Sequence, residues 1–249
     1  MIITISGQYG SGGNEVGARL AEALNYKLLD SQLVVRAREI YTEISGSTEK
    51  PIWWPSRYHT PFHEEDDFPR LDTPYEQAEF KLKTDLIATD TSFENLGPVA
   101  DKVRQAMLEA QSKAILEFAE EGDCILFGKC SNFVLRDYPD SVHVFSTADL
   151  EIRIKRIRNL YNMSMKKMRG ADGAPSAYTI RDARRFFINM SRKKATELIL
   201  ATDKRRASCY EFITGEKWGD LDRFDFLISG NDLNLDAQTD KLLETVKSK

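Results

Sequence analysis

The first 24 residues, MIITISGQYGSGGNEVGARLAEAL (1–24), combine a short apolar run, a cluster of glycines and an amphipathic segment. The run 2–6 predicts a short buried strand, and Val16, Leu20 and Leu24 have the spacing of one face of a helix. Glycines let backbone N–H groups turn inward, and a helix N-terminus carries partial positive charge, so an oxyanion is the natural occupant of the loop between them. This opening therefore predicts a phosphate-binding loop.

The loop carries only part of the P-loop signature. Gly7 and Gly12 reproduce its glycine spacing, but Gly13 stands where that signature has the lysine that reaches the β- and γ-phosphates. Two other interpretations of the same residues stay open. Gly10-x-Gly12 with Asp30 about twenty residues on resembles a dinucleotide fingerprint, although Glu15 stands where its third glycine belongs. A glycine turn with no ligand is the third interpretation.

The rest of the chain alternates short apolar strands with helices, which predicts a parallel sheet covered on both faces. We expect one domain over 1–249 with a P-loop-type three-layer αβα fold. Its five parallel strands are expected at about 2–6, 26–29, 124–127, 142–146 and 224–228, and its helices at 14–24, 31–44, 99–121, from Asp149 onward and at 236–247. Residues 45–98 are irregular, with a helix possible at 75–87, and predict an excursion from the core.

Composition excludes several classes of protein. The net charge of −4 does not favour a nucleic-acid partner. No segment approaches the roughly 18 apolar residues of a membrane span, and the N-terminus lacks a basic signal region, so we expect a cytoplasmic protein with no membrane partner. The three cysteines form no C-x-x-C pair and favour neither a disulfide framework nor a zinc site. Nothing in the sequence indicates the oligomeric state.

Positive charge is concentrated in one region. Residues 151–206 hold sixteen Lys and Arg against five acids, so the remainder of the chain is strongly acidic. Most of these side chains are expected on solvated helix faces. A segment this basic in an acidic protein still indicates that something anionic docks there.

Three further stretches resemble cytidylate kinases and the cytidylate kinase-like family. LLDSQLVVRA (28–37) is similar to the LDSGAxYR element of cytidylate kinases. CILFGKCSNFVLRDYPDSVHVFSTADLEIRIKRI (124–157) and TDKRRASCYEFITGEKWGDLDRFDFLIS (202–229) are similar to later segments of the cytidylate kinase-like family. The opening loop resembles this family's ISrqyGSGGreiG, in which glycine already replaces the lysine.

The sequence departs from the family pattern at three positions. Lys129 takes the place of a phosphate-binding arginine, Cys130 replaces the aspartate of true cytidylate kinases, and Asn14 stands where the family has arginine. The exchange at Lys129 keeps the charge but loses the bidentate fork of an arginine.

The resemblance implies ATP-dependent phosphoryl transfer to a nucleoside monophosphate or a related small acceptor, with ATP and Mg²⁺ as cofactors. The donor phosphates would lie on Gly7, Gly10, Ser11, Gly12, Gly13 and Asn14. The acceptor would be bound by Asp30, Ser31, Arg36, Lys129 and Asp203. Catalytic charge would come from Arg153, Arg206 and Lys129, and Asp30 is the candidate metal ligand. Within the domain, 31–98 would be the acceptor-binding excursion and 158–206 a basic helical lid. Closure of the lid would bring an arginine to the transferred group in place of the absent lysine, and the candidates are Arg153, Arg156, Arg205 and Arg206.

Two other functions stay open. A nucleotide-binding regulatory protein that keeps the fold without catalysis is favoured by the missing lysine, by Asn14 and by Glu15, which stands where related kinases have threonine. A dinucleotide-binding oxidoreductase is the third, and the basic lid counts against it.

Overall fold

The computed structural model describes residues 1–46, 100–167, 191–232 and 234–248. Most of the predicted acceptor excursion and the middle of the predicted lid lie outside the described residues, as does the possible helix at 75–87. No helix within the described ranges is long and apolar enough to cross a membrane.

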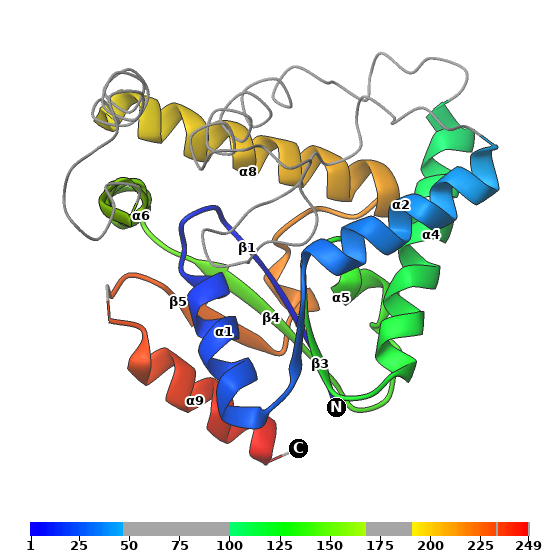
Figure 1. The fold of residues 1–249 in the computed structure, drawn as a ribbon, viewed down its shortest axis with the longest axis horizontal. Coiled ribbons are helices and arrows are strands. Elements are labelled where there is room, and N and C mark those ends of the chain that lie inside the picture. The colour runs from blue at the N-terminus through cyan, green and yellow to red at the C-terminus, as the bar shows by residue number, and fades with distance from the viewer. Residues whose placement is uncertain (47–99, 168–190, 233, 249) are drawn as a thin grey trace.

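Five parallel strands form one sheet in the order β2-β3-β1-β4-β5 (Figure 1). β1 lies at its centre, with Ile2 paired to Cys124 on one side and to Ser141 on the other. The strands are β1 Ile2–Gly7, β2 Lys27–Leu29, β3 Cys124–Phe127, β4 Ser141–Thr147 and β5 Phe226–Ser229. The predicted α/β class and five-stranded parallel sheet are confirmed.

Strand ends differ from the expected ranges by one or two residues, for local reasons. β2 begins at Lys27 because the Tyr26 N–H bonds the carbonyl of Ala21 and still belongs to the end of the preceding helix. β5 begins at Phe226, which pairs with Val144 in the ladder.

Alternate residues of the strands face two helical layers, as parallel sheets require. Ile3, Ile5, Ile125 and Phe127 pack with one layer, formed by α1 and α9. The described helices are α1 Gly13–Leu24, α2 Ser31–Ser45, α4 Ala100–Glu120, α5 Ser131–Val134, α6 Leu150–Lys167, α8 Arg192–Thr214 and α9 Asp236–Lys247, with a short 3-10 helix η2 at Leu221–Arg223.

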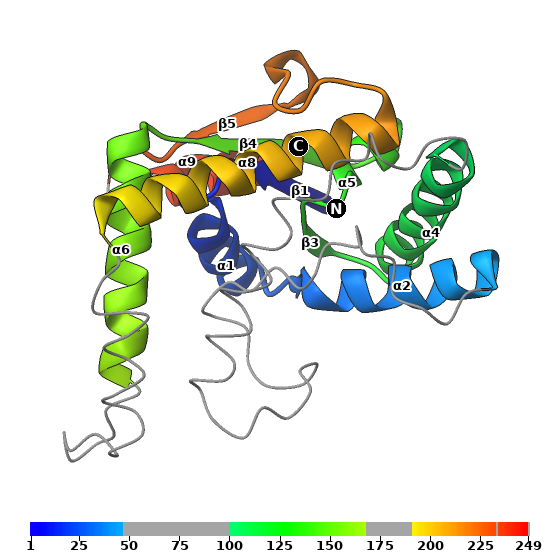
Figure 2. The ribbon, with the colours of Figure 1, turned by 90° about the horizontal axis from the view of Figure 1, so that it is seen from above.

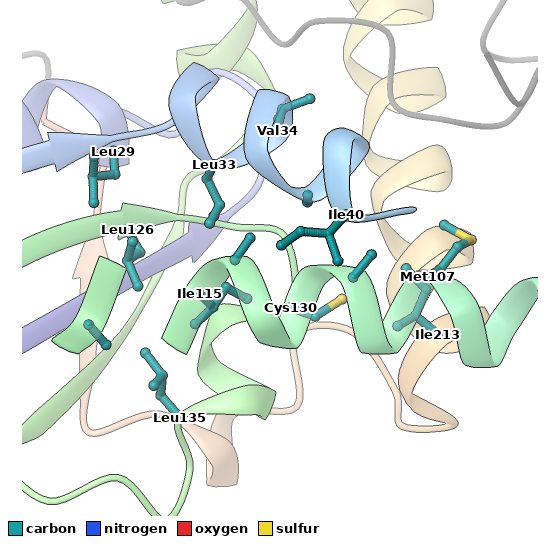
Figure 3. Packing of buried hydrophobic residues seen from close by; sticks show 14 of the residues in the cluster. Leu29, Leu33, Val34, Ile40, Met107, Ile115, Leu126, Cys130, Leu135 and Ile213 are labelled. Carbon is teal, nitrogen blue, oxygen red and sulfur yellow. The ribbon is translucent and has the colours of Figure 1, made fainter. Parts of the chain in front are cut away.

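The opposite face carries the larger core. Leu126 of β3 and Leu29 of β2 contact α2 and α4 there, and the cluster extends through Ile115 to Ile213 of α8 (Figure 3). All four are nearly or fully buried, and burial of each stabilises the fold by roughly 1.5–3 kcal/mol. This packing fixes the places where β2 and β3 end, which is where ligands of open α/β sheets bind.

α8 connects two parts of the molecule. Its first half packs on α6 through Ala195, Leu198 and Ile199, and its last turns reach the core beside α4 through Tyr210 and Ile213 (Figures 1 and 2). The predicted lid range 158–206 therefore ends inside a continuous helix.

Candidate phosphate-binding site

The loop between β1 and α1 is a tight turn held by its own backbone. The Ser11 N–H and the Ser11 hydroxyl both donate to the carbonyl of Gln8, at 3.1 and 2.7 Å, and the Gln8 N–H donates to the carbonyl of Ser146 at 2.9 Å. Gly10 and Gly12 have φ of 79° and 97°, in the left-handed region that side chains rarely adopt. The predicted glycine loop is thus a defined turn at the end of the central strand.

Close backbone packing explains other glycines around the loop. A Cβ on Gly7 would lie 2.4 Å from the carbonyl oxygen of Ser146, and one on Gly230 would lie 1.7 Å from the carbonyl oxygen of Ser11. A Cβ on Gly13 would lie 2.8 Å from the Cβ of Ser146. These positions have no room for a side chain, because the strand ends and the loop backbone are in direct contact.

The start of α1 has the features of an anion-binding helix N-terminus. Gly12 caps the helix without a side-chain hydrogen bond, and its carbonyl accepts the first intrahelical bond from Val16. The N–H groups of Gly13, Asn14 and Glu15 therefore have no acceptor within the helix, and the helix dipole adds partial positive charge at the same point. Such an N-terminus at the carboxyl end of a parallel sheet can bind a phosphate.

Three arginines bond carbonyl oxygens of the loop. Arg206 of α8 donates to Gly7 at 2.6 Å. From α6, Arg153 donates to the carbonyl of Tyr9 at 3.4 Å and Arg156 donates to that of Gly10 at 2.7 Å. The structure thus brings the two predicted catalytic arginines, Arg153 and Arg206, to the predicted donor loop.

Arg156 ties three backbone segments together. Besides Gly10, its guanidinium donates to the carbonyls of Gly230 and Asp232 at 3.0 and 2.9 Å, and the residue is 7% exposed. Burial lowers the pKa of Arg156, against the charge of Glu15. These contacts hold the loop in place. The sequence analysis also names Arg156 as a candidate to face the transferred phosphoryl group.

Asp203 reaches the donor loop from α8. Its carboxylate accepts the Tyr9 N–H at 2.7 Å and forms an ion pair with Arg153. One helical turn on, the guanidinium of Arg206 lies over the Tyr9 ring, 5.5 Å from its centre. Asp203, predicted for the acceptor, therefore contacts the tip of the donor loop.

Lys129 and Asp30 meet where β3 and β2 end. The Lys129 ammonium lies 2.5 Å from a carboxylate oxygen of Asp30, and the two side chains are 10% and 4% exposed. Gly128, Lys129 and Cys130 have consecutive positive φ values of 61°, 54° and 61°. A left-handed conformation costs a non-glycine residue roughly 1–2 kcal/mol, so packing around this turn must offset that strain.

Two cysteines pack close behind this turn. Burial raises the pKa of Cys130 well above its usual range, and the nearby Cys209 adds to that rise. Burial also raises the pKa of Cys209 to about 11, against the opposing charges of Arg205 and Lys129. Among the described residues, no group of three or more His, Cys, Asp or Glu is placed to hold a metal ion.

The structure does not bring Arg36 to this site. Arg36 donates to both carboxylate oxygens of Glu117 on α4, at 2.6 and 3.0 Å, and to Glu39 on its own helix. These bonds raise its pKa, with the hydrogen bond to Glu117 as the largest cause. In the structure Arg36 joins α2 to α4. The side chain of Ser31 lies outside the described residues.

Sequence reasoning missed Gln8, Ser146 and Gly230. The Gln8 side-chain oxygen accepts from the Thr147 hydroxyl at 2.6 Å and from the Ala148 N–H at 3.2 Å, so it ties the loop to the end of β4. Ser146 lies against the loop backbone. The sequence held one signal that could have found Ser146. The end of a strand that neighbours β1 must lie beside the loop that follows β1.

The strand order excludes the dinucleotide interpretation of Asp30. In the dinucleotide-binding order β2 is next to β1, but here β3 lies between them and the Asp30 carboxylate is paired with Lys129. A glycine-rich loop after the central strand of a sheet ordered β2-β3-β1-β4-β5 defines an α/β protein of the P-loop class.

The sequence model of the cytidylate kinase-like family matches residues 2–185, and the chain belongs to that family. The predicted resemblance to the cytidylate kinase-like family is confirmed, and the chain is a P-loop protein of the kinase type. No curated protein matches the sequence.

A solved structure shares the fold. An uncharacterized protein from Eubacterium ventriosum is 20% identical, with 100% of this chain and 99% of that chain covered and a TM-score of 0.58. Shikimate kinases from Acinetobacter baumannii and Bacteroides thetaiotaomicron are more distant. The first is 16% identical over 99% of this chain and 93% of its own, with a TM-score of 0.40. The second is 11% identical over 100% and 97%, with a TM-score of 0.42.

Proposed function

We propose that the protein transfers the γ-phosphoryl group of ATP to a nucleoside monophosphate or a related small phosphorylated or hydroxyl acceptor. The observation that supports the proposal is that the glycine loop and Lys129, the two predicted phosphate-binding features, follow neighbouring strands. The loop at 7–13 follows β1, and Lys129 follows β3, which pairs directly with β1. Donor and acceptor phosphates bound at these two places would be adjacent, as in-line transfer requires.

The donor half of the proposal rests on backbone groups. The N–H groups of Gly13 and Asn14 would bind the ATP phosphates, and Gly7, Gly10, Ser11 and Gly12 shape the turn that presents them. Mg²⁺, when bound, would neutralise charge on the phosphates. Asp30 is the one predicted metal ligand, and a magnesium ion held mainly by substrate phosphates and water needs few protein carboxylates.

The acceptor half rests on the strand tips. Lys129 and Asp30 would bind the acceptor, with Ser31 and the excursion 31–98 completing the site, whereas Asp203, predicted for the acceptor, contacts the donor loop. In the structure the Lys129 charge is balanced by Asp30 and the Arg36 charge by Glu117. An acceptor phosphate would have to compete with these carboxylates, and Lys129 is the nearer of the two cations to the loop strand.

Charge stabilisation of the transferred group would come from Arg153, Arg206 and Lys129. Phosphoryl transfer needs positioning and charge neutralisation more than covalent chemistry, and one arginine contributes factors of about 10³ to 10⁵ in other enzymes of this kind. Closure of the lid 158–206 would exclude water. Because α8 is packed into the core beyond residue 206, such a closure would leave its last turns in place.

The test is a screen for acceptor-dependent ADP release with ATP and Mg²⁺ over the nucleoside monophosphates, their deoxy forms and small hydroxyl compounds. At least one acceptor should stimulate ADP release well above the rate with ATP alone. If none does, and ATP still raises the melting temperature, the protein binds nucleotide without consuming it.

That second function, nucleotide binding without catalysis, is favoured by one observation. Gly13 supplies no side chain at the position of the usual catalytic lysine. Stabilisation by NAD in place of ATP would contradict both functions.

A further inference from the structure

The small core between α6 and α8 is separate from the two cores on the sheet. It consists of buried apolar side chains of the two helices, Ile154 and Ile157 from α6 and Ala195, Leu198 and Ile199 from α8. Within the described ranges, two partly buried hydrophobic residues pack against it, Leu150 at the start of α6 and Tyr9 from the glycine loop. Tyr9 therefore joins the loop to the packing of this helix pair.

Each part of Tyr9 is held by one of these helices. Its N–H donates to the carboxylate of Asp203 on α8 at 2.7 Å, and its carbonyl accepts from Arg153 on α6 at 3.4 Å. Asp203 and Arg153 are ion-paired to each other, with side chains 16% and 7% exposed. The guanidinium of Arg206 lies over the Tyr9 ring. The position of the loop tip therefore depends on both helices at once.

The base and the tip of the loop are attached to different parts of the molecule. At the base, Gln8 bonds the end of β4 through its backbone and its side chain. At the tip, Tyr9 and Gly10 lie against the helix pair, and a Cβ on Gly10 would lie 3.0 Å from Cγ1 of Ile157. Ile157 belongs to the core between α6 and α8. A shift of that core relative to the sheet would therefore change the shape of the loop.

Small changes in the shape of a binding loop have large effects. Binding groups must be held within about 0.5 Å of the productive geometry, and a misplacement of about 1 Å can cost roughly a hundredfold in rate. The packing of α6 on α8 can thus set the affinity of the loop without contact with its ligand. An aromatic residue suits this task, because one rigid ring fills a large volume.

We propose that Tyr9 is a positioning residue that couples the glycine loop to the packing of α6 on α8. Nucleotide affinity at the loop then depends on core side chains of the two helices, although these carry no group that recognises a nucleotide. The inference rests on the proposed function for its ligand, ATP. Because coupling between two sites is reciprocal, ATP at the loop stabilises the packing of α6 on α8 by the same free energy.

Binding of ATP with Mg²⁺ and without an acceptor, measured by titration calorimetry, tests the role of the ring. Tyr9→Ala should weaken binding about tenfold or more, whereas Tyr9→Phe keeps the ring and should stay within about threefold of the unaltered protein. Tyr138→Ala is the matched control, because Tyr138 is a partly buried tyrosine that packs on the larger sheet core. It should change ATP binding by less than about twofold. Unchanged binding by Tyr9→Ala, or equal weakening by Tyr138→Ala, would overturn the proposal.

A double-variant cycle tests the route from the helices to the loop. Leu198→Ala removes buried apolar packing on α8 and should weaken ATP binding about fivefold in the unaltered protein. In the Tyr9→Ala background the same change should weaken binding by less than about twofold, because the connection is already broken. Met107→Ala removes a buried side chain of similar size from α4 and should leave ATP affinity unchanged. Additive effects of Tyr9→Ala and Leu198→Ala, or no effect of Leu198→Ala alone, would contradict the coupling.

Amide hydrogen exchange of the ligand-free protein tests the same contact from the side of the helices. Tyr9→Ala should speed exchange of the amides at 195–199 about fivefold or more, with exchange in α4 unchanged. Saturating ATP should slow exchange at 195–199 in the unaltered protein and have much less effect there in Tyr9→Ala. Unchanged exchange at 195–199 in ligand-free Tyr9→Ala would overturn the proposal whether or not the protein is a kinase.

These measurements use no acceptor and no turnover. ATP binding that depends on Tyr9, without phosphorylation of any acceptor, would leave this inference standing and remove the proposed transfer. Transfer that proceeds while Tyr9→Ala binds ATP like the unaltered protein would do the reverse. Absence of ATP binding to the unaltered protein would overturn both.

Discussion

Lys129 and Asp30 form an ion pair with little contact with water at the tips of adjacent strands. The attraction within such a pair offsets the cost of removing both charges from water only while both partners are present. A single substitution leaves one charge buried without its partner, which is far more costly than removing an exposed pair. This makes the pair a structural element at the tips of β2 and β3.

Lys129→Met should lower the free energy of unfolding by about 3–5 kcal/mol, and Lys129→Met with Asp30→Leu should lower it less. Urea unfolding measures both. Lys27→Met is the control, because Lys27 pairs with Glu121 at the surface and should cost about 1 kcal/mol or less. A double variant less stable than the single one would contradict this account of the pair.

The Cys209 thiol gives a prediction of pH dependence. Burial raises its pKa to about 11 from an ordinary value of 9.0, so the unfolded chain loses this proton first as the pH rises. The contribution of Cys209 to stability is complete below pH 9 and is lost as the pH rises toward 11.

Urea unfolding between pH 8 and 11 measures this loss, and Cys209→Ala should show a shallower fall over that range. The variant still falls to some extent, because burial also raises the pKa of Cys124 to about 11. Equal slopes for the two proteins would show that the Cys209 thiol does not contribute.

At the scale of elements, α4 is held to the sheet by a narrow apolar face. Ile115 is fully buried in the core shared with β3 and α2, whereas its neighbour Leu116 is 38% exposed (Figure 3). This core positions the ends of β2 and β3, and hence Asp30 and Lys129. Loss of packing there should therefore reach the site as well as the stability of the fold.

Ile115→Ala should cost about 2–5 kcal/mol in free energy of unfolding, from lost transfer energy and the cavity left behind. Leu116→Ala removes a side chain of similar size from the partly exposed face and should cost about 1 kcal/mol or less. Chemical denaturation of the two variants measures both free energies of unfolding. Similar losses of stability in the two would contradict the position of Ile115 in the core.

The fold could be predicted from the sequence to a greater extent than the site. Strand positions follow from short apolar runs between helices, and these depend on local pattern. The partner of Arg36 cannot be predicted from local pattern, because Glu117 lies 81 residues away and only the packing of α2 on α4 brings the two together. The same holds for the Tyr9 N–H, whose acceptor Asp203 is 194 residues away. Gly13 was visible as a missing lysine, but its reason, contact with Ser146, needed the register of β1 and β4.

At the scale of the whole molecule, α8 connects the glycine loop to α6 and to the core. It is packed on α6 at one end and on the core beside α4 at the other, and its middle carries Asp203 and Arg206 to the loop (Figure 1). A change in the packing of either end would shift two contacts to the loop together. The basic region thus includes side chains that support the loop.

The most direct test follows the labelled γ-phosphate of ATP in the presence of Mg²⁺ and a mixture of nucleoside monophosphates, with products separated by chromatography. The account predicts label in a nucleoside diphosphate, formed by the unaltered protein and reduced at least a hundredfold by Arg206→Met. Label that stays in ATP, or that appears only as inorganic phosphate with every acceptor supplied, would contradict it.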